Sequence, residues 1–405
     1  MMNHRLLILL IITAVLAACG KTRPGTGKDA SVTVGAEVLI DRHFGELEGK
    51  RVGLVMNPTA RIGTTHMLDT LIALNVNVTA LFAPEHGFRG EAGAGEVIED
   101  GVDQETGLPV YSLYGDTRKP TPDMLEAIDL LLFDMQDVGA RFYTYNVTLG
   151  LVLEAAATAD VPLWVLDRPN PAGGEYVSGW ILREEYRSFV GAYPIPMAHG
   201  MTLGELAGMM VGEQWINIES TPQLRVIEMG GWERSMKWPD TGLAWFPPSP
   251  NLPTFEHAFV YMGTVLFEGT TLSEGRGTDD PFLTIGSPAT EITDGDLAVL
   301  GDAFPSLEIE RTTFTPRSIP GKALNPKHEG VTCRGVRISV GDYDRFRPVT
   351  FGVRLLEVML ASTPGAGTRE FIYKLAGTKA VTEFDMNWKD EIQAFRERRK
   401  EYLIY

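Results

Sequence analysis

The chain has 405 residues, of which 44% are hydrophobic and 22% charged, a composition typical of globular proteins and too apolar for a disordered chain. Its 36 Lys and Arg residues against 53 Asp and Glu residues give a formal charge of −17, which argues against a basic groove for nucleic acid. Only two cysteines are present, which excludes a disulfide framework and a Cys-rich zinc site.

The first residues predict a processing signal rather than a folded element. Arg5 precedes an apolar run over 6–15, which is too short to cross a membrane as a helix, and Leu-Ala-Ala-Cys follows at 16–19. These four residues resemble a bacterial lipobox, which implies cleavage after residue 18 and lipidation of Cys19. We therefore expect a signal peptide over 1–18, a tether over 19–34 and a cell-envelope lipoprotein, facing the periplasm or the cell surface and anchored at Cys19. An ordinary secretory signal with a chance cysteine is the alternative.

From about residue 50, short apolar runs alternate with helical patterns. This order is typical of βαβ units and predicts a parallel, Rossmann-like α/β domain over 35–235. The run at 129–134 is almost continuously apolar, as in a strand that is covered on both faces. The expected strands lie at 51–56, 76–83, 110–114, 129–134 and 162–167, and the expected helices lie at 65–74, from Thr121-Pro122 onward, at 146–159 and at 202–213.

A proline-rich stretch at 245–253 interrupts this pattern, and a smaller α+β domain is expected over 236–405. At about 100–200 residues per domain, the chain length agrees with two domains. The second domain begins with a Gly- and Thr-rich loop over 267–282. Strands are then expected near 305–315 and 331–340, and helices at 350–361 and 388–401.

Polar residues follow the expected strands at their carboxyl ends, where ligands of parallel α/β sheets bind. A facing loop in the second domain adds two carboxylates and an arginine. The candidates are Asn57 after the first strand; Glu85, His86 and Arg89 after the second; Asp134, Asp137, Arg141, Tyr143 and Tyr145 after the strand at 129–134; Arg168 and Asn170 after the next; and Glu268, Glu274 and Arg276 in the facing loop.

Each of these groups also has a purely structural interpretation. Asp134 could cap a turn, and Asp167-Arg168 could be an internal ion pair. Arg141 could pack against its aromatic neighbours, or it could clamp an anion beside a stacked sugar. Glu85-His86 could be a helix-start carboxylate next to a packed histidine.

Several chemistries lack their motifs. The sequence has no phosphate-binding P-loop, no H-E-x-x-H, no G-x-S-x-G and no complete dinucleotide fingerprint, and its seven histidines are scattered. We therefore expect no metal and no cofactor. The residues that do cluster are carboxylates, aromatics, Asn and Arg, which is the set that glycoside hydrolysis needs.

Seven motifs resemble the NamZ-type exo-β-N-acetylmuramidases, glycoside hydrolase family 171. They are PEHG at 84–87, GLPVYSLYG at 107–115, DMQDVGARFYTY at 134–145, LDRPNP at 166–171, HGMTLGE at 199–205, PSPNLP at 248–253 and EGTTLSEGRGT at 268–278. The resemblance runs from about residue 35 to the C-terminus. It implies a Rossmann-like domain beside a smaller one, an active site in the cleft between them, and release of N-acetylmuramic acid from the non-reducing end of peptidoglycan fragments such as MurNAc-GlcNAc.

From the family motif, Glu85 is expected to be the leading catalytic carboxylate. Its place after a buried strand and beside Phe88 suits a general acid, because removal from water favours the protonated form. The second catalytic group stays open among Asp134, Asp137, Glu268 and Glu274.

The remaining candidates are expected to bind the sugar, and nucleic acid is not expected as a partner. Arg89, Arg141 or Arg276 would bind the lactyl carboxylate, Tyr143 and Tyr145 would stack on the sugar, Asn57, Asn170 and Asn251 would bind hydroxyl or acetamido groups, and His86, Asp137 and Arg168 would make further contacts. The rival interpretation is a non-catalytic muropeptide-binding lipoprotein on the same scaffold.

Overall fold

A computed structural model describes residues 31–89, 100–218 and 220–405. The expected signal peptide, Cys19 and most of the expected tether lie outside these residues. Ser31–Tyr405 make up one compact unit. In the described ranges, no helix combines the length and the apolar character that crossing a bilayer requires.

The centre of the unit is a mostly parallel sheet, as the alternating pattern predicted. Within the described residues it has seven strands in the order β11-β8-β7-β1-β4-β6-β5, and only β5 runs antiparallel to its neighbour. β1 and β7, which lie next to each other, are buried along their whole length. The strands are β1 (Val52–Met56), β4 (Val78–Ala83), β5 (Gly101–Val102), β6 (Pro109–Ser112), β7 (Leu130–Asp134), β8 (Leu163–Leu166) and β11 (Leu224–Ile227).

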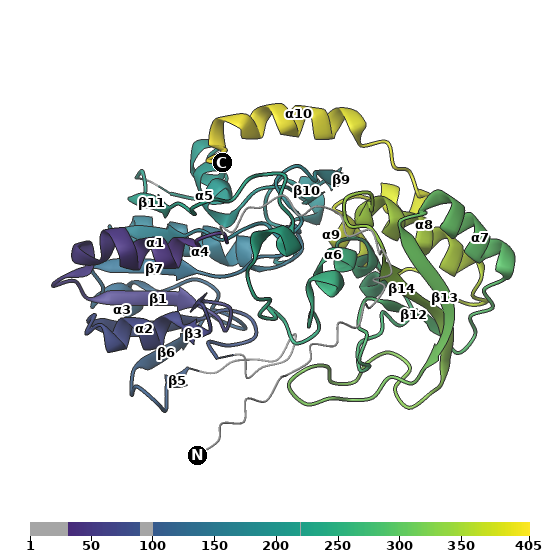
Figure 1. The fold of residues 1–405 in the computed structure, drawn as a ribbon, viewed down its shortest axis with the longest axis horizontal. Helices are drawn as coiled ribbons and strands as arrows, with labels where there is room; N and C mark the ends of the chain where they lie inside the picture. Colours follow the sequence, from purple (N-terminus) through teal and green to yellow (C-terminus); the bar gives the residue numbers. More distant parts are fainter. Residues whose placement is uncertain (1–30, 90–99, 219) are drawn as a thin grey trace, which may run out of the picture. The chain divides into compact units, whose positions relative to one another are not determined.

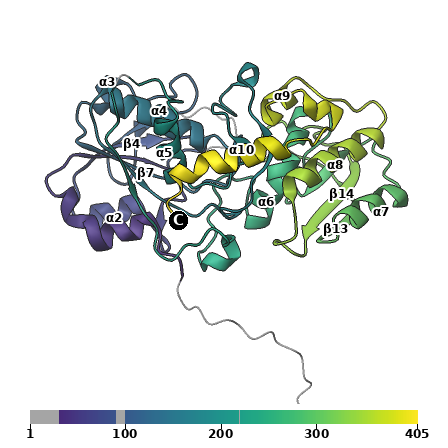
Figure 2. The ribbon, with the colours of Figure 1, turned by 90° about the horizontal axis from the view of Figure 1, so that it is seen from above.

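Helices cover both faces of this sheet, because successive side chains of a strand point to opposite faces. Leu54 and Leu132 join an apolar cluster with α2, whereas Val55 and Phe133 join the cluster that contains α4 and α5. Figure 2 shows the sheet edge-on between α2 and α4. The helices of this part are α1 (Gly35–Val38), α2 (Met67–Ala73), α3 (Pro122–Leu125), α4 (Tyr145–Thr158) and α5 (Leu203–Gly212).

The start of α5 has the capping box that its sequence indicates. Thr202 Oγ1 accepts a 3.2 Å hydrogen bond from the Glu205 backbone N–H, and Glu205 accepts a 3.0 Å bond from the Thr202 N–H. The expected helix at 65–74 is shorter, because β3 (Thr65–His66) pairs with β2 (Arg61–Ile62) before α2 begins. The edge strand β11 and the hairpin of β9 (Ser178–Ile181) and β10 (Pro196–Ala198) were not predicted.

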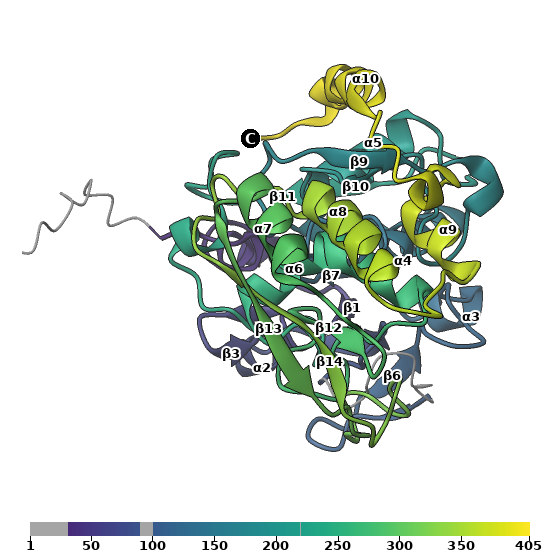
Figure 3. The same cartoon turned by 90° about the vertical axis from the view of Figure 1, so that its right-hand side faces the viewer.

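The C-terminal part contains a three-stranded antiparallel sheet in the order β12-β14-β13, seen with its helices in Figure 3. The two strands expected near 305–315 and 331–340 are β13 and β14, and the expected helix at 350–361 is α8. The elements are α6 (Phe255–Thr264), β12 (Thr284–Ser287), α7 (Asp294–Ala303), β13 (Leu307–Phe314), β14 (Cys333–Val340), α8 (Pro348–Ala361), α9 (Phe371–Ala376) and α10 (Lys389–Arg399).

The chain then returns to the first sheet. In Figure 1, α10 (yellow) runs from the C-terminal part to the region of α5, and it contacts β9. An apolar cluster is continuous from the central sheet into α6 and α8. Within it, Phe142 and Tyr261 meet edge to face at 5.3 Å between ring centroids. The loop after β7 is therefore held against the C-terminal part. The expected domain division at residue 235 stays a prediction.

Candidate active site

Glu85 lies in a tight turn after β4. His86 and Gly87 both adopt left-handed backbone conformations, with φ of 74° and 83°, and the Gly87 N–H bonds the Pro84 carbonyl at 3.0 Å. The Thr144 hydroxyl donates a 2.8 Å hydrogen bond to Glu85 Oε2. Burial raises the pKa of Tyr114 to about 12, and the charge of Glu85, with which Tyr114 is hydrogen-bonded, adds to the effect. Two hydroxyls therefore orient the Glu85 carboxyl group.

A cavity of about 90 Å³ brings this turn together with the facing loop of the C-terminal part. Five of the residues predicted from the sequence reach it from the turn after β4, the loop after β7 and the segment after α6. It is lined by Glu85, His86, Phe142, Tyr143, Thr144, Val190, Ser249, Leu252, Tyr261, Glu268, Arg276, Phe282 and Leu375.

Glu268 and Arg276 form the charged wall opposite Glu85. Arg276 donates to Glu268 Oε1 from Nε at 3.1 Å and from Nη2 at 2.5 Å, and its guanidinium lies 5.0 Å from the centre of the Phe282 ring. Burial opposes the charged form of Arg276, but the carboxylates of Glu268 and Glu274 outweigh it and raise the pKa of Arg276 above its ordinary value. Arg276 therefore stays cationic at the cavity.

Glu274 lies behind this wall and does not line the cavity. It is buried, and it pairs with Arg276 at 3.6 Å and with Lys327 at 2.8 Å. Lys327 also donates to the Phe267 and Leu272 carbonyls at 2.7 and 2.9 Å. These contacts give Glu274 a supporting position, and Glu268 is the carboxylate that lines the cavity together with Glu85.

Two tyrosines line the cavity, and a third lies directly behind one of them. Tyr143 and Tyr261 line it, whereas Tyr145 is fully buried and donates a 2.9 Å bond to the Pro248 carbonyl. The rings of Tyr143 and Tyr145 meet edge to face at 4.8 Å. Burial raises the pKa of both Tyr143 and Tyr261, and the nearby Glu85 charge contributes. Tyr143 is thus accessible from the cavity, while Tyr145 is not.

Arg141 does not occupy the position of an anion clamp. Its side chain is fully buried, and its guanidinium donates to the carbonyls of Trp180 (2.6 Å), Ile195 (2.9 Å) and Leu375 (2.8 Å). Burial lowers the pKa of Arg141 to about 9. The expectation of a clamp is corrected to a structural role, because backbone segments from three parts of the chain occupy its donors.

Asp134 and Arg168 also lie away from the cavity, paired with each other. Asp134 is fully buried at the end of β7, and both of its oxygens accept hydrogen bonds from Arg168. Arg168 also donates to the Arg61 carbonyl at 2.9 Å. The sequence suggested Asp167 as a partner of Arg168, but Asp167 bonds elsewhere. Arg168 lines a different cavity of about 280 Å³, together with Thr59 and other residues.

Arg89 and Asn170 are likewise engaged in the scaffold. Arg89 makes two bonds to Asp103, at 2.8 and 3.2 Å, and lies 3.2 Å from Glu105. Asn170 accepts from the Ala172 N–H and donates to the Met201 carbonyl, both at 3.0 Å. Gly139 packs directly against Asn170, so closely that a Cβ atom at residue 139 would lie only 2.3 Å from Asn170 Oδ1.

The other predicted amides and Asp137 are buried beside the cavity rather than in its lining. Asn57 Oδ1 accepts from the Thr59 N–H at 3.0 Å, and Asp137 accepts from the Gly139 N–H at 2.7 Å. Asn251 donates to the Lys322 carbonyl at 2.7 Å. Asp137 Oδ1 and Asn251 Oδ1 have no hydrogen-bond partner among the residues described.

Four residues of the site were missed by the sequence analysis. Thr144 and Tyr114 lie inside two of the quoted motifs, so their hydroxyls were available as a signal. Tyr261 lies in an apolar helix and Lys327 in a loop without a motif, and nothing local marked either residue. In the described ranges, no group of three or more His, Cys, Asp or Glu side chains could hold a metal ion.

Comparisons with known proteins match nearly the whole chain. Two family models match it: "Exo-beta-N-acetylmuramidase NamZ, N-terminal" over residues 52–256 and the corresponding C-terminal model over 259–405. The chain is 40% identical over 412 aligned positions to the peptidoglycan β-N-acetylmuramidase NamZ of Bacillus subtilis (strain 168), covering 97% of this chain and 96% of that protein.

Solved structures agree with these matches. Two DUF1343 family proteins of Bacteroides fragilis NCTC 9343 are similar, with TM-scores of 0.78 and 0.77 and identities of 33% and 35%. Each comparison covers 93% of this chain and 99% of the other. The likeness therefore extends over both the central sheet and the C-terminal part.

Proposed function

Because the chain belongs to the NamZ family of exo-β-N-acetylmuramidases, we propose that it is an exo-acting glycoside hydrolase that releases N-acetylmuramic acid from the non-reducing end of peptidoglycan fragments such as MurNAc-GlcNAc. The observation that carries the proposal is the shared cavity. Glu85 and the Glu268–Arg276 pair are far apart in the sequence, yet they line the same small space.

In this proposal Glu85 acts as the acid and Glu268 as the second carboxylate. Glu85 donates its proton to the glycosidic oxygen as the bond from that oxygen to the anomeric carbon breaks. The Glu268 carboxylate faces the positive charge that develops on the anomeric carbon. Water then adds to that carbon and gives up a proton to a carboxylate of the cavity, which returns the site to its starting protonation and completes the hydrolysis. The Thr144 bond keeps the Glu85 carboxyl directed at the cavity.

In this proposal Arg276 recognises the lactyl carboxylate of the substrate. Two of its nitrogens bond Glu268, and none of the described residues accepts a hydrogen bond from its third nitrogen, Nη1. A carboxylate of the substrate would gain a charge-assisted hydrogen bond there. Of the three arginines that the sequence offered, only Arg276 lines the cavity. Tyr143 supplies an aromatic edge beside it.

We also propose that the chain works as an envelope lipoprotein that is held by lipid on Cys19. The support is the lipobox-like sequence at 16–19 after an apolar run of signal-peptide length. The membrane would then be a partner through this lipid alone, and the sugar substrate would be the partner of the cavity.

The test uses the chain from residue 20 onward with two chromogenic substrates, 4-nitrophenyl β-N-acetylmuramide and the matching N-acetylglucosaminide. Release of nitrophenol from the muramide, and not from the glucosaminide, is the expected result. Tight binding of N-acetylmuramic acid without release from either substrate would instead support the non-catalytic binding protein. An equal rate on both substrates would contradict the proposal that the enzyme recognises the lactyl group.

A further inference from the structure

A second cavity, of about 710 Å³, shares no lining residue with the candidate active site. Its walls come from the segment 172–178 before β9, from 234–237, from 344–347 before α8 and from the end of α10. Six cationic side chains line it: Arg234, Lys237, Arg347, Arg396, Arg399 and Lys400.

The lining carries a positive charge within an acidic protein. Three carboxylates, Glu175, Asp344 and Glu397, accompany the six cations, which leaves a formal excess of three positive charges in a chain of net charge −17. Lys237 pairs with Asp344 and Lys400 with Glu397, each at 2.5 Å. The charge of these two lysines is therefore largely compensated.

Three of the arginines form no ion pair with a carboxylate of the described residues. Arg347 donates to the carbonyls of Asp344 (2.7 Å) and Phe346 (2.9 Å), and Arg396 donates to the Glu175 carbonyl at 3.1 Å. Arg399 also bonds only carbonyls. A backbone carbonyl satisfies a guanidinium N–H but does not neutralise its charge.

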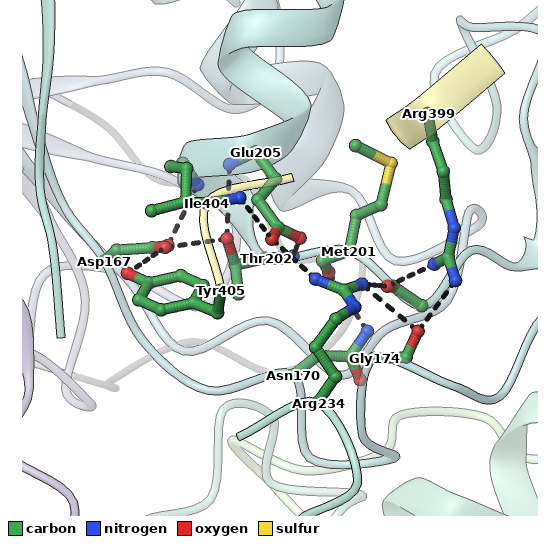
Figure 4. A network of polar contacts seen from close by, with 12 residues as sticks. Asp167, Asn170, Gly174, Met201, Thr202, Glu205, Arg234, Arg399, Ile404 and Tyr405 are labelled. Atoms are coloured by element: carbon green, nitrogen blue, oxygen red, sulfur yellow. Dashed lines mark hydrogen bonds and ion pairs between the residues drawn. The ribbon is translucent and has the colours of Figure 1, made fainter. Parts of the chain in front are cut away.

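The innermost pair of arginines is the most unusual feature of the lining. Arg234 and Arg399 share two acceptors, the carbonyls of Gly174 and Gly200, with bonds of 2.5 to 3.1 Å (Figure 4). Glu205 pairs with Arg234 at 2.6 Å, so one carboxylate faces two guanidinium groups. Burial, and then the charges of Arg234 and Arg396, lower the pKa of Arg399 to about 10.

Arg399 is well placed to gain a partner. Its side chain is only 6% exposed, and its Nε is buried with no hydrogen-bond partner among the described residues. Like charges held together in a partly enclosed space raise the free energy of the empty cavity, and an anion between them would lower it. Arginine forks match carboxylate and phosphate groups in particular, because both present two coplanar oxygens.

We propose that this cavity is a second ligand site, which binds a small molecule carrying two or more carboxylate or phosphate groups. Its volume lies in the range of small-molecule sites and is larger than a single phosphate needs. Separate oxyanion groups would contact Arg347, Arg396 and Arg399, which come from two elements of the C-terminal part. The bound molecule would also lie against the segment 172–178 and would hold α10 to it.

The experiment measures binding of two probes to the full-length protein by calorimetry, with chloride added to equal ionic strength. Pyrophosphate represents the phosphate class and citrate the carboxylate class. The variant Arg347→Gln/Arg396→Gln removes two of the arginine charges that lack an ion pair. The control Arg334→Gln/Arg354→Gln removes the same charge from two exposed arginines that do not line the cavity.

We expect one molecule of at least one probe to bind per chain, and to bind at least about tenfold more weakly to the cavity variant, since each lost contact is a charge-assisted one. The control should match the unchanged protein. The probe that binds more tightly identifies the class of ligand. Arg347 and Arg396 are both exposed, so we expect their replacement to leave the fold intact. Thermal unfolding of each variant without ligand checks this.

The proposal is overturned if neither probe binds, or if the cavity variant and the control bind equally well. Hydrolysis of the chromogenic muramide is measured on the same samples and should be the same in all three proteins. A failure of the catalytic proposal would therefore appear as missing hydrolysis, and a failure of the second site as missing or variant-insensitive binding.

Discussion

Thr144 donates a 2.8 Å hydrogen bond to Glu85 across the end of β1, which lies between the two strands that precede these residues. Glu85 follows β4, and Thr144 belongs to the loop after β7. The bond therefore ties together two loops of the carboxyl edge of the sheet. The orientation of Glu85 depends on the strand order and not on its own turn alone.

The first prediction concerns Glu85 itself. Glu85→Gln keeps the shape and the Thr144 contact but removes the proton that the glycosidic oxygen would receive. We expect kcat for the chromogenic muramide to fall by at least ~10²-fold, the low end of acid–base catalysis, while N-acetylmuramic acid still binds in calorimetry. Glu308→Gln, at an exposed position of β13, is the control. A Glu85 variant with nearly full activity would remove Glu85 from the acid role.

The second prediction separates the contribution of the Thr144 hydroxyl from its volume. A hydrogen bond to a charged group contributes about 1.5–3 kcal/mol, so Thr144→Val should lower kcat by roughly 10- to 100-fold. KM should change much less, because Thr144 positions Glu85. Thr144→Ser restores the hydroxyl and should restore most of the rate. Equal losses in the Ser and Val variants would show that the packing of Thr144 matters and the hydroxyl does not.

The third prediction tests which arginine recognises the lactyl carboxylate. Arg276→Gln should weaken inhibition by N-acetylmuramic acid by roughly 10-fold or more and should leave inhibition by N-acetylglucosamine nearly unchanged. The ratio of the two inhibition constants is insensitive to a partial loss of folded protein. Arg89→Gln, in which the lost contacts are to Asp103 and Glu105, should leave the ratio unaltered. A ratio that changes in the Arg89 variant and not in the Arg276 variant would instead assign recognition of the lactyl carboxylate to Arg89.

The fourth prediction concerns the effect of pH on stability. Burial raises the pKa of Asp167 to about 7, well above that of an unfolded Asp near 4. Between these values the folded chain holds a proton that the unfolded chain has released, so this group makes the free energy of unfolding fall as pH rises from about 4 to about 7. The full effect is on the order of 4 kcal/mol.

Urea unfolding measured over that pH range would reveal the contribution of Asp167. Asp167→Asn removes the titrating group and should flatten the decline with pH, whatever its effect on absolute stability. Asp302→Asn, at an exposed position in α7, is the control and should keep the slope of the unchanged protein. A slope that is the same in the Asp167 variant would contradict the raised pKa.

The fifth prediction concerns the proposed anchor. Expressed with its own N-terminus in a bacterium, the protein should partition into the detergent phase on phase separation. Cys19→Ala should move it to the aqueous phase, and the mature mass should lack the acyl groups. If the unchanged protein partitions into water and carries no acyl mass, the chain has an ordinary secretory signal.

Much of the fold could be predicted because its signals are local. The apolar runs that form β1, β4, β7 and β8 and the capping box of α5 can be recognised within a few neighbouring residues. β11 was missed because it is a half-buried edge strand with two charged or polar neighbours, so its pattern is weak. Pairing with β8 stabilises it, and that pairing is not visible in its own sequence.

The site was harder to predict, because the distinction between a catalytic and a structural polar residue depends on distant backbone. Arg141 among aromatic residues looks like a ligand clamp, yet one of its acceptors, the Leu375 carbonyl, lies 234 residues away. Glu268 and Glu274 occur in one loop with similar neighbours. Glu274 is bound by Lys327, which comes from another loop, and it lies behind the wall, whereas Glu268 lines the cavity.

The contacts of Ile404 and Tyr405 have a consequence for the order in which the chain can fold. The Tyr405 hydroxyl donates a 2.9 Å hydrogen bond to Asp167 just after β8, and the Ile404 N–H donates a 3.0 Å bond to Glu205 in α5. The ribosome makes β8 and α5 long before it makes these partners. The surroundings of Asp167 therefore cannot be completed before residues 404 and 405 have been synthesised.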